Sequence, residues 1–221
     1  MTLTNEAEAR DWLAQLPGVD AAAWGRLELL ATLLAQENTR QNLVSAASLG
    51  AVWLRHIVDS AQLLRLVPRE TFADASAQWL DLGTGAGFPG LVIAALRPEM
   101  PVAMVESRAK RIDWLERARL AMALPHARVI GARLEAVPSF PAAVISARAF
   151  APLENILSLS ARFSTARSLY LLPKGRSARQ ELAALPTGRR GFGGKFHVEP
   201  SLTDPDAGIV VGHLTTPGKK P

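Results

Sequence analysis

The residues whose types and spacing are best suited to chemistry lie between Trp79 and Gly90. The segment reads Trp-Leu-Asp-Leu-Gly-Thr-Gly-Ala-Gly-Phe-Pro-Gly, so four glycines occur within eight positions. Glycine adopts positive φ angles without strain and lets the backbone approach a ligand closely. An apolar run followed by such a turn predicts a strand, a cradle for a small molecule and the start of a helix.

Asp81 distinguishes two classes of ligand. The spacing Gly85-x-Gly87-x-x-Gly90 also fits the dinucleotide pattern, in which a pyrophosphate lies at the turn and the helix N-terminus. A carboxylate two residues before the first glycine would repel that pyrophosphate. S-adenosylmethionine has no phosphate, and an acidic group would attract its ammonium. We therefore expect the turn to bind S-adenosylmethionine through Asp81, Gly83, Gly85 and Gly87.

Further donor-binding residues are expected at the ends of the next strands. Glu106 ends an apolar run about 23 residues after Gly83, where a doubly wound fold binds a ribose hydroxyl. Leu134 and Glu135 follow a third expected strand and would flank the adenine. Arg148 follows a fourth, and its partner is either the carboxylate of the donor or a substrate phosphate.

Phe88, within the turn, would cover the donor or the target base, or pack in the core. An expected helix over residues 49–67, with Ser48 as its cap, carries Arg55, His56 and Asp59. Their spacing fits an ion pair within the helix beside a surface histidine, or a polar cluster that faces the cofactor cleft and the substrate. Lys174, after a fifth strand, would lie along the same edge of the sheet, and we expect it to contact the substrate.

The remaining patterns predict the elements that position these side chains. Apolar runs predict strands at 79–82, 102–106, 127–131, 143–146 and 168–172, with helices between them, and a final hairpin near 195–198 and 208–212. This alternation indicates an α/β fold with a mostly parallel sheet and helices on both faces. We expect residues 1–70 to form an N-terminal helical extension and residues 71–221 to form the ligand-binding domain.

Composition narrows the class of protein. Residues 1–100 hold 7 basic and 11 acidic side chains, whereas residues 101–200 hold 16 and 7, which suggests a polyanionic partner such as nucleic acid. The absence of cysteine excludes disulfides, thiolate metal sites and a cysteine nucleophile. The polar, acidic start and the lack of a long apolar run indicate no signal peptide and no membrane span. We expect a cytoplasmic monomer that binds no metal.

The absence of certain residues narrows the set of methylation reactions that the sequence fits. Attack on pyrimidine C5 needs a thiolate, and the chain has none. The segment Ser146-Ala-Arg-Ala-Phe150 is unlike the Asn/Asp-Pro-Pro-aromatic sequence used on exocyclic amines, and no lysine precedes Lys110 to serve ribose methylation. A ring nitrogen with a lone pair, such as guanine N7, needs alignment with the donor but no general base.

Four segments together resemble the bacterial small-subunit ribosomal RNA methyltransferase G family, also called GidB. They are Gln41-Asn-Leu-Val-Ser45, Arg55-His-Ile-Val-Asp-Ser60, Leu80-Asp-Leu-Gly-Thr-Gly-Ala-Gly-Phe-Pro-Gly90 and Ser146-Ala-Arg-Ala-Phe-Ala151. The resemblance runs from about residue 38 to residue 176. The ending Phe-Pro-Gly, with the arginine-containing segments on either side, is far more specific than the glycine turn alone.

The resemblance implies a Rossmann-like class I methyltransferase fold and the cofactor S-adenosylmethionine. It also implies methylation at N7 of a guanosine in the decoding-region loop of 16S ribosomal RNA. The family's donor contacts would fall on Gly83, Phe88, Leu134, Glu135 and Arg148. The family usually has Leu-Lys-Gly after the fifth strand, whereas a proline precedes Lys174 here. Two rival interpretations remain: a methyltransferase for a small molecule or a protein, and a nucleotide-binding module without enzyme activity.

Overall fold

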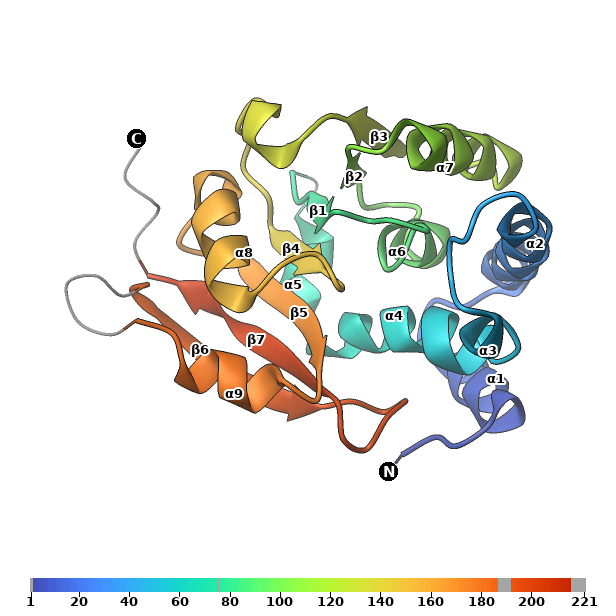
Figure 1. Cartoon of the computed structure of the whole chain (residues 1–221), viewed down its shortest axis with the longest axis horizontal. Coiled ribbons are helices and arrows are strands. Elements are labelled where there is room, and N and C mark those ends of the chain that lie inside the picture. Colours follow the sequence, from blue (N-terminus) through green and yellow to red (C-terminus); the bar gives the residue numbers. More distant parts are fainter. Residues whose placement is uncertain (1, 75, 187–191, 216–221) are drawn as a thin grey trace.

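A computed structural model describes residues 2–74, 76–186 and 192–215. Within these residues seven strands form one sheet in the order β3-β2-β1-β4-β5-β7-β6 (Figure 1). The strands are β1 (Trp79–Leu82), β2 (Val102–Glu106), β3 (Ala127–Gly131), β4 (Val144–Ala147), β5 (Leu169–Gly175), β6 (Gly194–Pro200) and β7 (Gly208–Leu214). Strands β1 to β5 run parallel, and β7 pairs antiparallel with both β5 and β6. The mostly parallel sheet and the terminal hairpin are confirmed.

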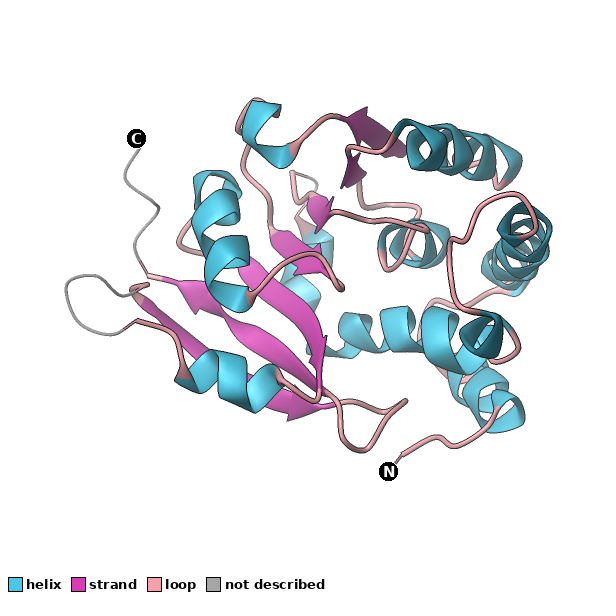
Figure 2. Cartoon of the chain, in the orientation of Figure 1, coloured by secondary structure: helices cyan, strands magenta, loops and turns pink. Residues whose placement is uncertain are grey.

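Helices cover both faces of the sheet (Figure 2). On one face lie α6 (Gly90–Leu96) and α7 (Ala109–Ala121), whose apolar side chains form one cluster with those of α1 (Glu6–Ala14) and α2 (Ala21–Asn38). On the other face α8 (Leu153–Ser160) and α9 (Ala178–Ala183) enclose a second cluster with β4, β5 and β7. Strands β1 and β2 are buried along their whole length because both faces are covered.

The N-terminal helices begin where polar side chains accept backbone N–H groups. Asp20 caps α2 as its sequence position predicts, with its carboxylate 2.7 Å from the Ala23 nitrogen. The short helix α3 (Ala46–Leu49) is capped by Ser45. The expected cap at Ser48 was therefore wrong.

The expected continuous helix over residues 49–67 was also wrong. The segment consists of α3, a π-helical turn η1 (Trp53–Val58), a short α4 (Asp59–Ala61) and a 3₁₀ turn η2 (Gln62–Leu66), and α5 (Arg69–Ala73) follows. The carboxylate of Glu6 in α1 accepts bonds from the nitrogens of Trp53 and Leu54, so a distant side chain fixes where the turn begins. A π-helical turn rotates the side chains that follow it, which hydrophobic spacing alone does not reveal.

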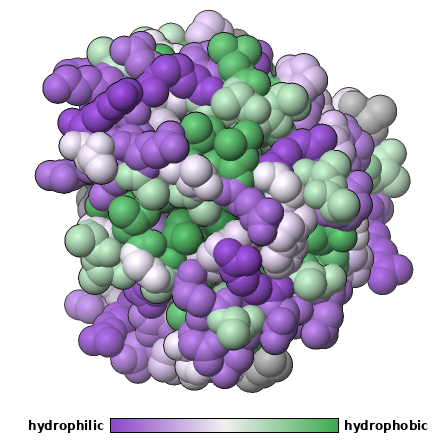
Figure 3. Space-filling view, turned by 90° about the vertical axis from the view of Figure 1, so that its right-hand side faces the viewer, coloured by the Kyte–Doolittle hydropathy of each residue, from purple (hydrophilic) through white to green (hydrophobic). Residues whose placement is uncertain are grey.

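The side of the molecule formed by these N-terminal helices has a mixed surface, with apolar areas among hydrophilic ones (Figure 3). The two large apolar side chains most exposed in the described residues are Leu120 of α7, at 66%, and Leu29 of α2, at 36%. Among the described helices, none combines the length and the apolar character needed to cross a bilayer. The Gly- and Arg-containing residues 187–191 lie outside the described part of the chain.

Candidate functional site

The glycine turn between β1 and α6 forms part of the wall of a cavity of about 420 Å³ at the carboxyl ends of β1 and β2. Gly83 and Gly85 have φ angles of +59° and +60°, a backbone region that favours glycine. A Cβ atom on Gly83 would collide with the ring of Phe150, whereas one on Gly85 would lie 3.5 Å from Nη1 of Arg111. The positive φ angles that the glycines were expected to supply are present at Gly83 and Gly85, and Gly83 leaves room for the ring of Phe150.

Asp81 lies behind the turn rather than in the cavity. Its side chain is fully buried; one carboxylate oxygen accepts the Gly90 N–H at 3.0 Å, and the other accepts the Ser146 hydroxyl at 2.8 Å. Ser146 also accepts the indole N–H of Trp79. Burial raises the pKa of Asp81 to about 6, although the bonds that it accepts oppose this shift. We expected Asp81 to act on the donor directly; its placement instead supports an indirect role, in which it fixes both ends of the turn.

Glu106 connects the turn to the start of α7. One of its oxygens accepts the Gly85 N–H at 3.1 Å, and the other accepts the N–H groups of Ser107 and Arg108 at 2.7 and 2.9 Å. The N-cap residue of α7, Arg108, forms no side-chain capping bond, so Glu106 is the side chain that fixes the backbone just before the helix. Arg111 lies 3.8 Å from the same carboxylate, at the edge of the cavity.

The far wall of this cavity comes from the segment after β3. Leu134 and Glu135 lie in a single 3₁₀ turn, with Leu134 buried and Glu135 exposed, and both line the cavity. The apolar side chain of Leu134, the carboxylate of Glu106 and the glycine backbone suit an adenosine, because the first can contact the base and the second can accept bonds from ribose hydroxyls. The residues present therefore fit S-adenosylmethionine.

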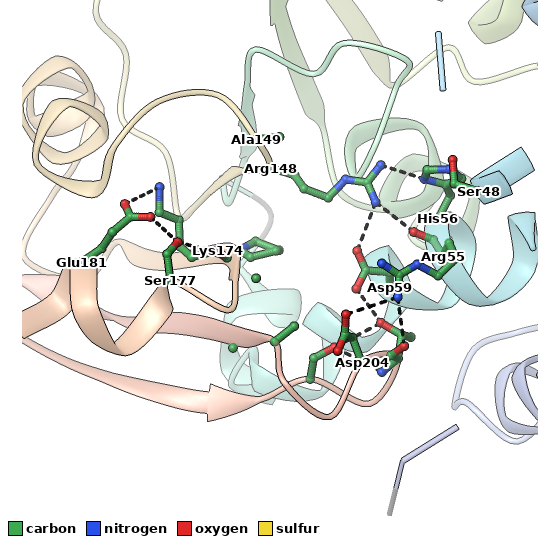
Figure 4. Close-up of a pocket in the computed structure, with 16 residues that line it drawn as sticks. Ser48, Arg55, His56, Asp59, Arg148, Ala149, Lys174, Ser177, Glu181 and Asp204 are labelled. Carbon is green, nitrogen blue, oxygen red and sulfur yellow. Dashed lines mark hydrogen bonds and ion pairs between the residues drawn. The ribbon is translucent and has the colours of Figure 1, made fainter. Parts of the chain in front are cut away.

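A second cavity, of about 550 Å³, contains the side chains expected to meet the substrate (Figure 4). Arg55, His56, Asp59, Arg148 and Lys174 all line it, although they come from three separate regions of the chain. The loop between β6 and β7 contributes further polar residues to this wall, namely Ser201, Thr203 and Asp204.

Arg148 links these regions. One terminal nitrogen, Nη1, lies 3.1 Å from the Arg55 carbonyl oxygen and 3.1 Å from Oδ2 of Asp59, and Nη2 lies 2.9 Å from Nδ1 of His56. Of the two arrangements considered for the helix, the ion pair between Arg55 and Asp59 is not formed: Asp59 pairs with Arg148, and Arg55 lies 3.4 Å from Asp204. Thr203 donates its hydroxyl to Asp59 at 2.7 Å.

His56 is held neutral in this network. A guanidinium only donates hydrogen bonds, so Nδ1 of His56 must accept from Arg148, and the ring proton must be on Nε2. Burial, reinforced by the positive charges of Arg148 and Arg55, lowers the pKa of His56 to about 3. The imidazole stacks on Phe88, with ring centroids 4.9 Å apart. Phe88 is 2% exposed and so packs in the core beside the site.

Lys174 lines the second cavity, but its ammonium is bonded within the protein. Nζ lies 2.6 Å from the carbonyl oxygen of Ala151 and 2.8 Å from Glu181, and the side chain is 8% exposed. We expected Lys174 to contact the substrate; these bonds leave its side chain little freedom to do so.

Residues 148–152, the partition segment, separate the two cavities. Ala149 lines both, Arg148 lines only the second, and the ring of Phe150 lies over Gly83 in the first. Ala149 has a φ angle of +51°, a strained value for a residue with a side chain. Sequence reasoning missed Ala149, Phe150, Arg111, Thr203 and Glu181. Of these, only Phe150 carried a signal, as an aromatic residue directly after the conspicuous Arg148.

Known proteins similar in sequence cover almost all of the chain. The family model described as rRNA small subunit methyltransferase G matches residues 24–190. Ribosomal RNA small subunit methyltransferase G of Novosphingobium aromaticivorans is 55% identical over 221 residues, covering 100% of this chain and 93% of the relative. The protein of the same name from Erythrobacter litoralis is 53% identical, covering 95% of this chain and 97% of the relative.

Solved structures share the fold. A crystal structure of a mutant of MtNAS in complex with S-adenosylmethionine superimposes with a TM-score of 0.55 at 14% identity, covering 96% of this chain and 84% of that one. The putative methyltransferase yhhF from Escherichia coli has a TM-score of 0.53 at 16% identity, covering 72% of this chain and 87% of that one. The fold is therefore the Rossmann-like class I methyltransferase fold.

Proposed function

The chain belongs to the rRNA small subunit methyltransferase G family, and from this premise we propose that it methylates N7 of a guanosine in the decoding-region loop of bacterial 16S ribosomal RNA. The methyl donor is S-adenosylmethionine. The high identity to relatives named for this activity, over the full chain, supports an enzyme of this class rather than a small-molecule or protein methyltransferase or a nucleotide sensor.

The first cavity is the proposed donor site. Glu106 would receive the ribose hydroxyls, Leu134 and Glu135 would flank the adenine, and the backbone at Gly83 and Gly85 would approach the remainder of the donor. S-adenosylmethionine supplies an electrophilic methyl group on a positively charged sulfur. Gly87, Phe88 and Asp81 would act from behind the turn by fixing its shape.

The second cavity is the proposed guanosine site. N7 of guanine attacks with its own lone pair and has no proton to lose, so the residues need to orient the base and exclude water rather than remove a proton. A neutral His56 suits this task because the base becomes positively charged during methylation. Arg148 and Arg55 would pair with phosphate or with the donor carboxylate, and Asp59 holds Arg148 in place.

The observation that carries the proposal is the meeting of the two cavities at Ala149. Methyl transfer requires N7 to contact the methyl group directly, so a donor in one cavity and a base in the other would have to meet beside Ala149, at the edge of the partition segment. Alignment of the two reacting groups is the main source of rate acceleration when no base is required.

The proposed partner is ribosomal RNA, free or within the small subunit. Arg108, Arg111 and Arg133 line the rim of the donor cavity and would attract a polyanion. We also propose that the protein is a cytoplasmic monomer. No metal ion is required in this proposal, because alignment of the donor and the base suffices for the reaction. In this proposal residues 1–70 form the extension that carries Arg55, His56 and Asp59 to the main domain.

The test is transfer of labelled methyl groups from S-adenosylmethionine to small subunits from cells that lack this protein. The methylated nucleoside is then identified by mass spectrometry of RNA fragments. We expect one 7-methylguanosine in the decoding-region loop. Methylation of another nucleoside, or of protein alone, would refute the proposal. Titration with salt provides a second readout, because binding through phosphates weakens steeply as salt is added.

A further inference from the structure

Glu181 of α9 lines the second cavity and has three hydrogen-bonding partners, all of them within the protein. One carboxylate oxygen lies 2.8 Å from the backbone nitrogen of Leu153 and 2.8 Å from Nζ of Lys174. The other lies 2.6 Å from the hydroxyl of Ser177. A carboxylate with this number of donors is fixed in position, and it fixes its partners in turn.

Two of these partners hold the end of the partition segment. Leu153 is the first residue after the segment, and Lys174 donates to the carbonyl oxygen of Ala151 within it. Figure 4 shows Lys174, Ser177 and Glu181 gathered on one side of the cavity, opposite Arg148 and its partners. Arg148 anchors the beginning of the segment, so the two ends are held by different parts of the chain.

Anchoring at both ends keeps the partition segment in a backbone conformation that it would not adopt by itself. Ala149 has a left-handed backbone conformation that costs energy and persists only where the surroundings impose it. If the end at Ala151 were released, Ala149 would relax, and both Arg148 and Phe150 would shift. A displacement of about 1 Å between reacting groups is enough to lower a rate by about 100-fold.

We propose that Glu181 is a positioning residue, which acts through Lys174 and Leu153 to hold the partition segment in the shape that aligns donor and guanosine. The inference rests on the proposed function, because it concerns the wall between the two proposed sites. It also gives Lys174 a role within the protein in place of the substrate contact expected from the sequence.

The test compares Glu181→Gln, Lys174→Met and the double variant with wild-type protein. Glutamine keeps an oxygen for the Leu153 N–H but removes the charge that pairs with Lys174. The matched control is Asp206→Asn, which breaks the exposed pair between Arg176 and Asp206, 3.0 Å apart, without touching the partition segment. Each protein is assayed for donor affinity, for kcat and KM on small subunits, and for amide hydrogen exchange over residues 148–160.

We expect each single variant to exchange amide hydrogens in this peptide at least about 10-fold faster than wild type. We expect kcat to fall about 10- to 100-fold, with donor affinity within about 2-fold of wild type. The double variant should be no worse than the poorer single variant, because both changes release the same contact. The control should match wild type.

Unchanged exchange in Glu181→Gln would overturn the inference, as would a loss of kcat that only follows a loss of folded protein in a thermal melt. If wild-type protein transfers no methyl group to RNA, the proposed function fails instead. The exchange measurement would still decide whether Glu181 holds the segment, because it requires neither donor nor RNA.

Discussion

The carboxylate of Asp81 lies 3.0 Å from the backbone nitrogen of Gly90, so the end of strand β1 and the first residue of α6 are joined across the whole glycine turn. This bond explains why an acidic residue stands before the glycines even though it does not face the cavity. A carboxylate near the positive end of a helix is stabilised by the unpaired N–H groups there. Asp81 therefore supports the proposed donor site from outside the cavity, by fixing the conformation of the glycine turn.

The buried position of Asp81 predicts a specific dependence of stability on pH. Its pKa is raised from 3.8 to about 6, so between these values the folded state holds a proton that the unfolded state has lost. Its contribution to stability is present below pH 4 and is lost as pH rises through 6. Urea denaturation should show wild type losing about 2 kcal/mol relative to Asp81→Asn between pH 4 and pH 7. A constant difference would contradict the assignment.

The stability that His56 contributes should depend on pH in the opposite direction. Its pKa is lowered from 6.5 to about 3, so the stability it contributes is present above pH 6.5 and is lost as pH falls toward 3. Nitrogen NMR should find the ring neutral, with its proton on Nε2, at pH 5. In Arg148→Met the pKa of His56 should rise, because a positive charge and a fixed donor are both removed. A charged ring in wild type at pH 5 would refute the network.

We expect substitution of Gly83 to weaken donor binding. Gly83→Ala adds a Cβ atom that collides with Phe150 at a φ angle of +59°, so the turn or the partition segment must move. Calorimetry should show donor affinity at least about 10-fold weaker. Gly175→Ala is the control, since its φ angle is +61° and its Cβ would have no heavy atom within 4 Å. It should cost some stability and leave binding intact.

We expect substitution of Glu106 to weaken recognition of the donor ribose selectively. Glu106→Gln places an amide N–H against one of the backbone N–H groups that the carboxylate now accepts. Donor affinity should fall about 10- to 100-fold. An analogue of the donor that lacks the ribose hydroxyls should bind wild type weakly and should lose little more in the variant. Equal losses for both ligands would place Glu106 away from the ribose.

At position 148 we expect a positive charge alone to be insufficient for methyl transfer. Arg148→Lys retains a cation, but one ammonium cannot reproduce the planar contacts to Asp59, His56 and the Arg55 carbonyl. We expect kcat to fall about 100-fold on small subunits, with little change in thermal stability. Arg176→Lys, at an exposed pair, is the matched control. Full activity of Arg148→Lys would show that this geometry is dispensable.

Sequence reasoning reached the parts of the site that depend on local order. The glycine turn follows a buried strand, Glu106 ends the next one, and Arg148 follows β4, because parallel strands present their carboxyl ends at one edge of a sheet. The predicted bounds of β1, β2 and β3 match the structure, and those of the other strands differ by at most three residues at either end. These features follow from period and spacing, which the chain displays directly.

The contacts between distant segments could not be predicted in the same way. The partner of Asp59 is Arg148 rather than Arg55, since a π-helical turn and the packing of α1 set the direction of these side chains. Thr203 reaches the site only because β7 inserts between β5 and β6 in the sheet. The role of Lys174 depends on Glu181, whose spacing of seven residues carries no signal.

The N-terminal segment contacts the loop between β6 and β7 beside the site. The backbone nitrogen of Leu3 lies 2.7 Å from the carbonyl oxygen of Leu202, in the loop that carries Thr203 and Asp204, and Glu6 fixes the start of the turn that carries Arg55 and His56. Chimeric proteins exchanged only over residues 24–190 would pair a site from one parent with terminal supports from another. We therefore expect functional exchange between relatives to require that the N-terminal segment and the loop between β6 and β7 be transplanted together.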